Sequence, residues 1–444
     1  MQGTKSKHLR YGVTLEVIQV EGGHKFSGEV TVEGAKNSAL KLMAATIMAP
    51  GVTTLTNVPN ISDVHVMGKV LKYLGAKIVV KGEHELEIDT TDVDKWETPY
   101  HLVAKMRAST AVMGPLLTRF GKAVVAMPGG CNIGARKIDM HILGLEALGV
   151  HFEIDHGNIH ASTPNGITGT TVTLDFASVG ATENLIMASV CAEGTTVIDN
   201  AAREPEIVDL ANLLNEMGAK VHGAGSPVIE VEGVKSLHAV ESHRVVGDRI
   251  EAGTFIAMGG LCGDPVTVRG FNPRHLGLVL KKYELMGLDI KTFEDGCTVS
   301  RKGAIHATDI QTLPFPGFPT DMQAQTMTLL ALCDGSCIIT ENVFENRFML
   351  ASELQRMGAD IRIEGHHAIV HGVKGFSGAE VKSPDLRGGA ALVMAGLVAD
   401  GVTTVSDIYH IDRGYEKFVP KLQGLGAKVE RLELPEEDID DPLM

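Results

Sequence analysis

The chain has 444 residues, of which 44% are hydrophobic and 21% charged, and its formal net charge is −15. This length and composition predict a globular protein of two or three domains with a large core. The acidic balance argues against nucleic acid as a partner. No apolar run reaches the roughly 20 residues of a membrane-spanning helix, so we expect no membrane insertion.

The basic start of the chain, MQGTKSKHLR, leads into an alternating, strand-like segment and not into the apolar stretch of a signal peptide. We therefore expect a cytoplasmic protein. The six cysteines form no Cys-x-x-Cys pair, which favours free thiols in a reducing compartment. His366, His367 and His371 lie close together but have no acidic or cysteine residues at the spacing of a metal site, so we expect no metal.

Along the chain, one pattern of about 70 residues occurs six times. Each unit reads as a strand, an apolar helix, a β-branched strand, a second helix and a pair of strands. The glycines that open the β-branched strands are Gly51, Gly121, Gly194, Gly263, Gly335 and Gly401. The glycines that end the second helices, where a left-handed residue is needed, are Gly75, Gly149, Gly218, Gly287, Gly358 and Gly426. Because the first helices are apolar on most faces, we expect them to be buried in two α/β domains of three units each.

The second unit is longer than the others by about four residues. The excess lies in residues 128–141, PGGCNIGARKIDMH, a glycine-rich segment that contains Cys131 and Arg136. An insertion confined to one copy of a repeat is often functional, so we expect a loop that acts at the site. The alternative is a longer connection without chemistry. The segment is no dinucleotide fingerprint and the chain has no GxxxxGK[ST] loop, so we expect no nicotinamide or nucleoside triphosphate cofactor.

Cations stand at helix starts, where the helix dipole and free N–H groups attract anions and disfavour Lys or Arg. Lys36, Arg107 and Arg387 open three of the apolar helices. Arg413 occupies the place in the sixth unit that Arg136 has in the second. Together these residues predict a shared site for a multiply charged anion. For each residue alone, a structural ion pair is the alternative.

Carboxylates also stand at helix starts. Asp248 and Asp385 precede the fourth and sixth apolar helices, and Asp321 opens the fifth. Aspartate is a common helix cap, so capping is the favoured interpretation for Asp248 and Asp385.

Seven motifs, in order between about residue 16 and about residue 432, resemble those of the UDP-N-acetylglucosamine 1-carboxyvinyltransferase family. They read GAKNSAL, KMRAST, PGGCNIGAR, SVGAT, FPTDMQAQ, ENVFENRFM and HIDRGYE. The resemblance implies a two-domain inside-out α/β barrel with three βαβαββ units in each domain. We expect an N-terminal domain at 37–246, a C-terminal domain at 1–36 plus 247–434, and a disordered acidic tail at 435–444.

The resemblance further implies transfer of the enolpyruvyl group of phosphoenolpyruvate to the 3-hydroxyl of UDP-N-acetylglucosamine. This reaction is the first committed step of peptidoglycan precursor synthesis. The hydroxyl adds to C2 of the donor while C3 is protonated, and the tetrahedral intermediate then loses phosphate. The two small molecules are the expected partners, and the scheme requires no metal or other cofactor.

Residue roles follow from the same resemblance. The catalytic residues are expected to be Lys36, Cys131, Asp321 and Arg413. Cys131 would donate the proton to C3 and react with an epoxide phosphonate such as fosfomycin, Asp321 would act as the base, and Lys36, Arg136 and Arg413 would hold the donor. Contacts to the sugar nucleotide are expected from Asn37, Arg107, Arg136, Lys137, Ile138, Asp139, Met140, Phe176, Ala177, Ser178, Val179, Asp321 and Val343. Asp385 and Arg387 would form a pair near the closed site.

Two positions depart from the family pattern: Lys137 stands where proline is common, and Ser62 where some members have lysine. Two other functions stay open from the sequence. One is the sister enzyme that uses shikimate 3-phosphate as acceptor, which lacks the PGGCNIGAR loop. The other is a non-catalytic repeat protein that binds sugar nucleotides, which would need neither the cysteine nor the base.

Overall fold

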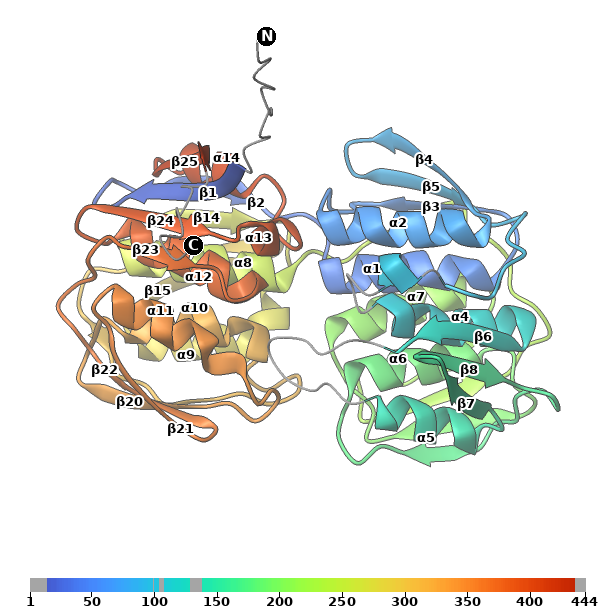
Figure 1. The fold of residues 1–444 in the computed structure, drawn as a ribbon. Coiled ribbons are helices and arrows are strands. Elements are labelled where there is room, and N and C mark those ends of the chain that lie inside the picture. Colours follow the sequence, from blue (N-terminus) through green and yellow to red (C-terminus); the bar gives the residue numbers. More distant parts are fainter. Residues whose placement is uncertain (1–13, 99, 104–107, 128–137, 436–444) are drawn as a thin grey trace, which may run out of the picture.

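The structure, a computed structural model, describes residues 14–98, 100–103, 108–127 and 138–435. The chain forms two lobes that lie side by side (Figure 1). Each lobe has its own hydrophobic core. One core draws on residues between Ala39 and Val245, and the other on residues 18–32 together with residues 250–429. We refer to them as the N-terminal and the C-terminal lobe.

The N-terminal lobe alternates helices with short strands. Its helices are α1 (Lys36–Ala45), η1 (Thr46–Met48), α2 (Ser62–Leu74), α3 (Tyr100–Val103), α4 (Ala108–Phe120), α5 (Asp139–Ala147), α6 (Val179–Ser189) and α7 (Pro205–Glu216). Its strands are β3 (Val52–Thr56), β4 (Lys77–Gly82), β5 (Glu85–Asp89), β6 (Lys122–Ala126), β7 (His151–Asp155), β8 (Asn158–Ser162), β9 (Thr171–Thr173), β10 (Thr195–Asp199), β11 (Lys220–His222), β12 (Val228–Glu232) and β13 (His243–Arg244).

The C-terminal lobe combines the start of the chain with its second half. Its helices are α8 (Arg249–Cys262), η2 (Pro273–Leu276), α9 (Gly277–Leu285), η3 (Thr320–Met322), α10 (Gln323–Leu330), η4 (Arg347–Met349), α11 (Leu350–Arg356), α12 (Leu386–Leu397), α13 (Tyr409–Asp412) and α14 (Phe418–Gly424). Its strands are β1 (Thr14–Glu21), β2 (Gly28–Thr31), β14 (Val266–Arg269), β15 (Asp289–Phe293), β16 (Gly296–Ser300), β17 (Ile305–His306), β18 (Ile310–Gln311), β19 (Cys333–Asp334), β20 (Ser336–Thr340), β21 (Asp360–Glu364), β22 (His367–His371), β23 (Glu380–Lys382), β24 (Val402–Ser406) and β25 (Lys428–Pro435).

The sheets of the described chain share one design. The four-stranded sheets have the orders β13-β3-β5-β4, β11-β12-β10-β9, β15-β16-β14-β2, β18-β20-β22-β21 and β23-β24-β1-β25. In each, one edge pair is parallel and the other two pairs are antiparallel. The sheet β6-β8-β7 has three antiparallel strands, and a single parallel bridge between Glu97 and Val124 stands at its edge. A two-stranded parallel sheet, β17-β19, is an addition that the repeat pattern did not predict.

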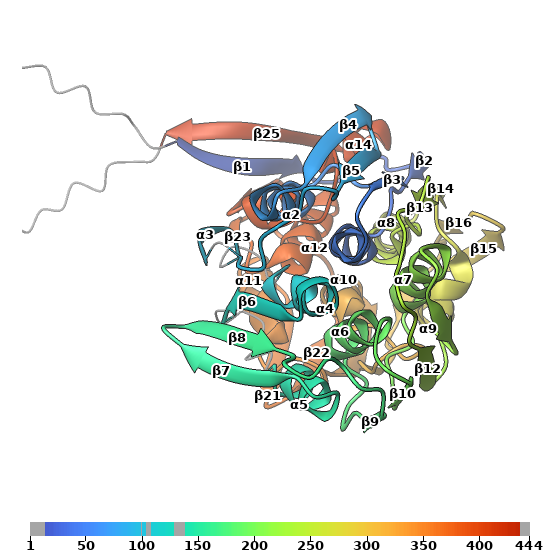
Figure 2. The same ribbon diagram turned by 90° about the vertical axis from the view of Figure 1, so that its right-hand side faces the viewer.

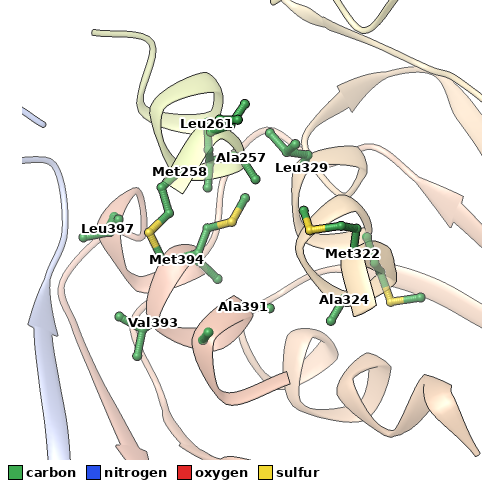
Figure 3. Packing of buried hydrophobic residues seen from close by; sticks show 14 of the residues in the cluster. Ala257, Met258, Leu261, Met322, Ala324, Leu329, Ala391, Val393, Met394 and Leu397 are labelled. Atoms are coloured by element: carbon green, nitrogen blue, oxygen red, sulfur yellow. The ribbon is translucent and has the colours of Figure 1, made fainter. Parts of the chain in front are cut away.

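The apolar helices lie inside the lobes and the sheets lie around them. In Figure 2, α1, α4 and α6 run through the middle of the N-terminal lobe. In the C-terminal lobe, α10 is buried over its whole length and α8 and α12 over nearly all of theirs. Figure 3 shows Met258 of α8 and Met394 of α12 pointing toward one another in this core. Helices α8 and α12 are apolar on most faces and have no face to present to water, which explains their burial.

Glycines set the end of the second helix of each unit. Gly75, Gly149, Gly218, Gly287, Gly358 and Gly426 all have φ between 92° and 113°. This left-handed conformation is strained for other residues, so the predicted role of these glycines is confirmed.

Two neighbouring segments connect the lobes. Gly34 and Gly247 form an antiparallel bridge, and the amide of Ala35 donates to the carbonyl of Val246 at 2.6 Å. A Cβ atom on Gly34 would lie 1.9 Å from the carbonyl oxygen of Asn57, so no larger residue fits at this crossing. The tight crossing sets where α1 begins and therefore places Lys36 between the lobes.

The two ends of the described chain pair with each other. Strand β1 is antiparallel to both β24 and β25, and its first residue, Thr14, is opposite Pro435. The predicted disordered tail from residue 435 is therefore wrong by one residue, because Pro435 still belongs to β25. Residues 436–444 of that tail lie outside the described residues.

Candidate active site

One carboxylate joins two of the predicted cations. The Nζ atom of Lys36, the first residue of α1, lies 2.7 Å from Oδ2 of Asp63 on α2. Arg413, which follows α13, donates to the same carboxylate from Nε to Oδ1 at 3.0 Å and from Nη2 to Oδ2 at 3.3 Å. Asp63 belongs to the N-terminal lobe and Arg413 to the C-terminal lobe. The predicted meeting of Lys36 and Arg413 is therefore observed, and it spans the two lobes.

Burial and neighbouring charges change the ionisation of this cluster. Burial is the main cause that lowers the pKa of Lys36 below its usual 10.5; Asp63 opposes the shift, and the positive charges of Arg413 and Arg387 add to it. Burial alone would raise the pKa of Asp63, but Lys36 and Arg413 together hold it below its usual 3.8. Asp63 is therefore ionised at neutral pH, and with Lys36 protonated the three groups carry one net positive charge.

A second cluster surrounds Asp321, in η3. Its Oδ1 accepts from Nη2 of Arg347 at 2.9 Å, and its Oδ2 accepts from Nη2 of Arg387 at 3.2 Å. Both arginine side chains are buried, whereas that of Asp321 is 25% exposed. Although burial works against it, the phenol of Tyr415 and the carboxylates of Asp321 and Asp248 raise the pKa of Arg387 above its usual value. Asp321 thus presents an oriented carboxylate with a partly open face.

Arg387 lies in the first turn of α12, as predicted. Its positive charge is balanced by the carboxylate of Asp321. Asp385 caps α12 by accepting from the backbone amides of Arg387 at 2.8 Å and Gly388 at 3.0 Å. Asp385 is thus the helix cap that the sequence favoured. It meets Arg387 through the backbone, and the Arg387 guanidinium turns to Asp321.

The expected contacts of the sugar nucleotide lie at several helix starts. Asn37 is exposed beside Lys36, and residues 176–179 lead into α6, where Ser178 caps the helix by accepting from the amide of Ala181 at 3.3 Å. Asp139 is exposed at the start of α5, whereas Ile138 and Met140 are half-buried against the core. Among these residues, Asn37, Asp139 and Phe176 are exposed and therefore the most accessible to a ligand.

Four of the predicted residues cannot be located. Arg107, Cys131, Arg136 and Lys137 lie outside the described residues. Their roles stay predictions.

Two residues of the clusters and one residue beside them were not predicted. Asp63 follows Ser62, which the sequence singled out only as a departure from the family pattern. Arg347 and Glu341 both lie in the ENVFENRFM motif. Buried Glu341 accepts from the hydroxyl of Thr320 at 3.0 Å and from the amide of Val343 at 2.8 Å, so it connects the loop of Val343 to η3 and Asp321.

Further polar contacts join the lobes. Arg249 makes two hydrogen bonds to Glu206, at 3.0 and 3.2 Å, on the side of the interface formed by α7 and α8. Glu83 and His84 meet Glu416, and the potential ligand atoms of these three residues lie within 4.8 Å of one another. Lys417 forms an ion pair with Glu83, so we interpret these residues as an ionic contact between the lobes and not as a metal site.

Among the described residues, no helix combines the length and the apolar character needed to cross a membrane.

Known proteins resemble this chain over almost its whole length. The family model described as EPSP synthase (3-phosphoshikimate 1-carboxyvinyltransferase) matches residues 20–422. UDP-N-acetylglucosamine 1-carboxyvinyltransferase 2 of Carboxydothermus hydrogenoformans is 53% identical over 420 residues, which are 94% of this chain and 100% of the relative. UDP-N-acetylglucosamine 1-carboxyvinyltransferase 1 of Staphylococcus aureus strain MRSA252 is 49% identical with the same coverage.

Solved structures agree on the fold. The enolpyruvyl transferase NikO from Streptomyces tendae has a TM-score of 0.86 at 24% identity, over 95% of this chain and 100% of that one. EPSP synthase from Acinetobacter baumannii has a TM-score of 0.74 at 18% identity, also over 95% and 100% of the two chains. The family predicted from the seven motifs is confirmed: the chain belongs to the enolpyruvyl transferases, among the UDP-N-acetylglucosamine 1-carboxyvinyltransferases.

Proposed function

We propose that this protein transfers the enolpyruvyl group of phosphoenolpyruvate to the 3-hydroxyl of UDP-N-acetylglucosamine and releases phosphate. The observation that carries the proposal is the meeting of Lys36, at the crossing between the lobes, and Arg413, of the C-terminal lobe, on Asp63 of the N-terminal lobe, in one cluster with a net positive charge. The names of relatives about half identical to this chain support the choice of acceptor.

The donor carries a phosphate and a carboxylate, and both are anions that guanidinium and ammonium groups bind well. Lys36 and Arg413 would hold these anions and stabilise the charge on the departing phosphate. Arg136 would add a third cation from the glycine-rich segment, and Cys131 in the same segment would protonate C3 of the donor.

Asp321 would accept the proton of the acceptor 3-hydroxyl. Its described guanidinium partners, Arg347 and Arg387, fix its orientation, and its side chain is 25% exposed, so a hydroxyl can reach it. The acceptor would contact Asn37, Arg107, residues 136–140, residues 176–179 and Val343, with Asp385 and Arg387 near the closed site.

We also propose the finer organisation of the fold. Six βαβαββ units would form two inside-out barrels, with domains at 37–246 and at 1–36 plus 247–434. The shared strand order of the sheets and the two separate cores support this division. The described cysteines, all free thiols, agree with a role in the cytoplasm.

The test is phosphate release from phosphoenolpyruvate with UDP-N-acetylglucosamine or shikimate 3-phosphate as acceptor. The family model that matches the chain is named after 3-phosphoshikimate 1-carboxyvinyltransferase, so both acceptors must be tested. We expect release only with the sugar nucleotide. Release only with shikimate 3-phosphate would overturn the choice of acceptor, and release with neither would overturn the enzymatic function.

A further inference from the structure

Asp63 occupies the centre of the cationic cluster as an anion of the protein itself. Its side chain is 4% exposed, and its two oxygens are engaged by Lys36 and by both donating nitrogens of Arg413. Lys36 and Arg413 hold the buried Asp63 carboxylate by three charge-assisted contacts, and they would hold a bound phosphate or carboxylate in the same way. Asp63 is therefore placed to compete with an anionic ligand for the same donors.

The surrounding charges strengthen this competition. Arg387 is close enough to Lys36 for its positive charge to disfavour the protonated amine. Asp248 accepts from the backbone amide of Lys36 at 3.3 Å, and its charge also acts on Arg387. If Asp63 were neutral while Lys36 kept its proton, this corner of the interface would gain one positive charge, and its attraction for anions would rise.

We propose that Asp63 is a positioning residue that acts as the internal counterion of the donor site. Asp63 holds Lys36 and Arg413 together across the lobes and limits the affinity of the empty site for inorganic phosphate. This proposal rests on the proposed function, because it treats phosphate as the released product. A donor with two anionic groups can replace Asp63 at more than one cation. Phosphate alone makes fewer contacts with these cations, binds less tightly and is released.

The test is the binding of inorganic phosphate to the full-length protein, measured by isothermal titration calorimetry without donor or acceptor. The variants are Asp63→Asn, which keeps the shape of the side chain, and Asp63→Ser, which keeps a polar group at the start of α2. We expect phosphate to bind about tenfold more tightly to each, because one opposing charge has been removed. Asp63→Glu keeps the charge and should bind phosphate within about threefold of the wild type.

The matched control is Asp92→Asn. Asp92 pairs with Lys77 at 2.6 Å in the same lobe, and both side chains are mostly exposed. This variant also removes one negative charge, but from an exposed ion pair that is not part of the Asp63 cluster. Its affinity for phosphate should therefore equal that of the wild type. Circular dichroism establishes that each variant is folded.

Unchanged or weaker phosphate binding in both folded neutral variants would overturn the proposal. Tighter binding in Asp92→Asn as well would also overturn it, because net charge alone would then explain the effect. Turnover is a separate readout. If the wild type transfers enolpyruvyl but the phosphate affinities do not differ, only this inference fails; if no turnover occurs, the proposed function fails whatever the binding result.

Discussion

Two carboxylates near the interface between the lobes, Asp63 and Asp321, each hold two cations, but they do so in different ways. The partners of Asp63 come from both lobes, so its cluster depends on how the lobes meet. Two described partners of Asp321, Arg347 and Arg387, belong to the C-terminal lobe and are buried there. Among the described residues, the proposed donor cations are therefore brought together by both lobes, whereas the arginines that orient the proposed base lie in one lobe.

The largest effect is expected when the cluster that spans the lobes loses its lysine. Lys36→Met keeps a long apolar stem but removes the ammonium group, so the donor anion and the departing phosphate lose a direct partner. We expect kcat/KM for the donor to fall on the order of 10³-fold, as measured by phosphate release. A drop of less than about tenfold would contradict the role of Lys36.

The cluster within the C-terminal lobe should respond differently. Asp321→Asn removes the proton acceptor and keeps a side chain of the same shape between Arg347 and Arg387. We expect kcat to fall about 10²-fold while the dissociation constant of UDP-N-acetylglucosamine, measured by calorimetry, changes little. Loss of sugar nucleotide binding with an unchanged kcat would assign Asp321 to binding and not to proton transfer.

Alkaline pH distinguishes the clusters through the lowered pKa of Lys36. In the proposed role the protonated amine of Lys36 binds the donor, and because the pKa of this amine lies below the usual 10.5, donor affinity should be lost as pH rises through a value below 10.5. The loss should approach about tenfold per pH unit. In Lys36→Arg the guanidinium stays charged, so the decline should disappear. Titrations of phosphoenolpyruvate binding against pH check this, and an identical decline in Lys36→Arg would contradict the assignment.

The smallest effect is expected at Glu341, which connects the loop of Val343 to η3. In Glu341→Gln an NH2 group, which accepts no hydrogen bond, replaces one of the two oxygens, so either the amide of Val343 or the hydroxyl of Thr320 loses its acceptor and the loop and η3 should be held less firmly. We expect KM for the acceptor to rise about threefold and the free energy of unfolding to fall by about 1 kcal/mol. Glu364→Gln, at an exposed ion pair with Arg362, is the control and should change neither value.

The sequence predicted what depends on local pattern. The six helix-ending glycines have the left-handed conformation expected of them, and Asp248 and Asp385 cap their helices as favoured. It also predicted that Lys36 and Arg413 lie together, and both contact Asp63; their binding of a shared anion stays a prediction.

The parts that were not predicted depend on tertiary contacts. Asp63 lies 350 residues from Arg413 in the chain, and nothing in the residues around it distinguishes it from an ordinary acidic residue in the first turn of a helix. Arg347 and Glu341 lie in a recognised motif, but their contacts with η3 become visible only when the fold brings β20 and η3 together. The extra pair β17-β19 is two residues long on each side, too short to leave a pattern.

The most direct test of enolpyruvyl transfer follows the carbon atoms. Phosphoenolpyruvate labelled with ¹³C at C2 and C3 is incubated with UDP-N-acetylglucosamine and the protein, and the product is examined by NMR. We predict an enol ether on the 3-oxygen of the sugar, formed in equal amount with free phosphate. Labelled pyruvate with an unmodified sugar nucleotide would contradict this account, because the protein would then hydrolyse the donor without transferring it.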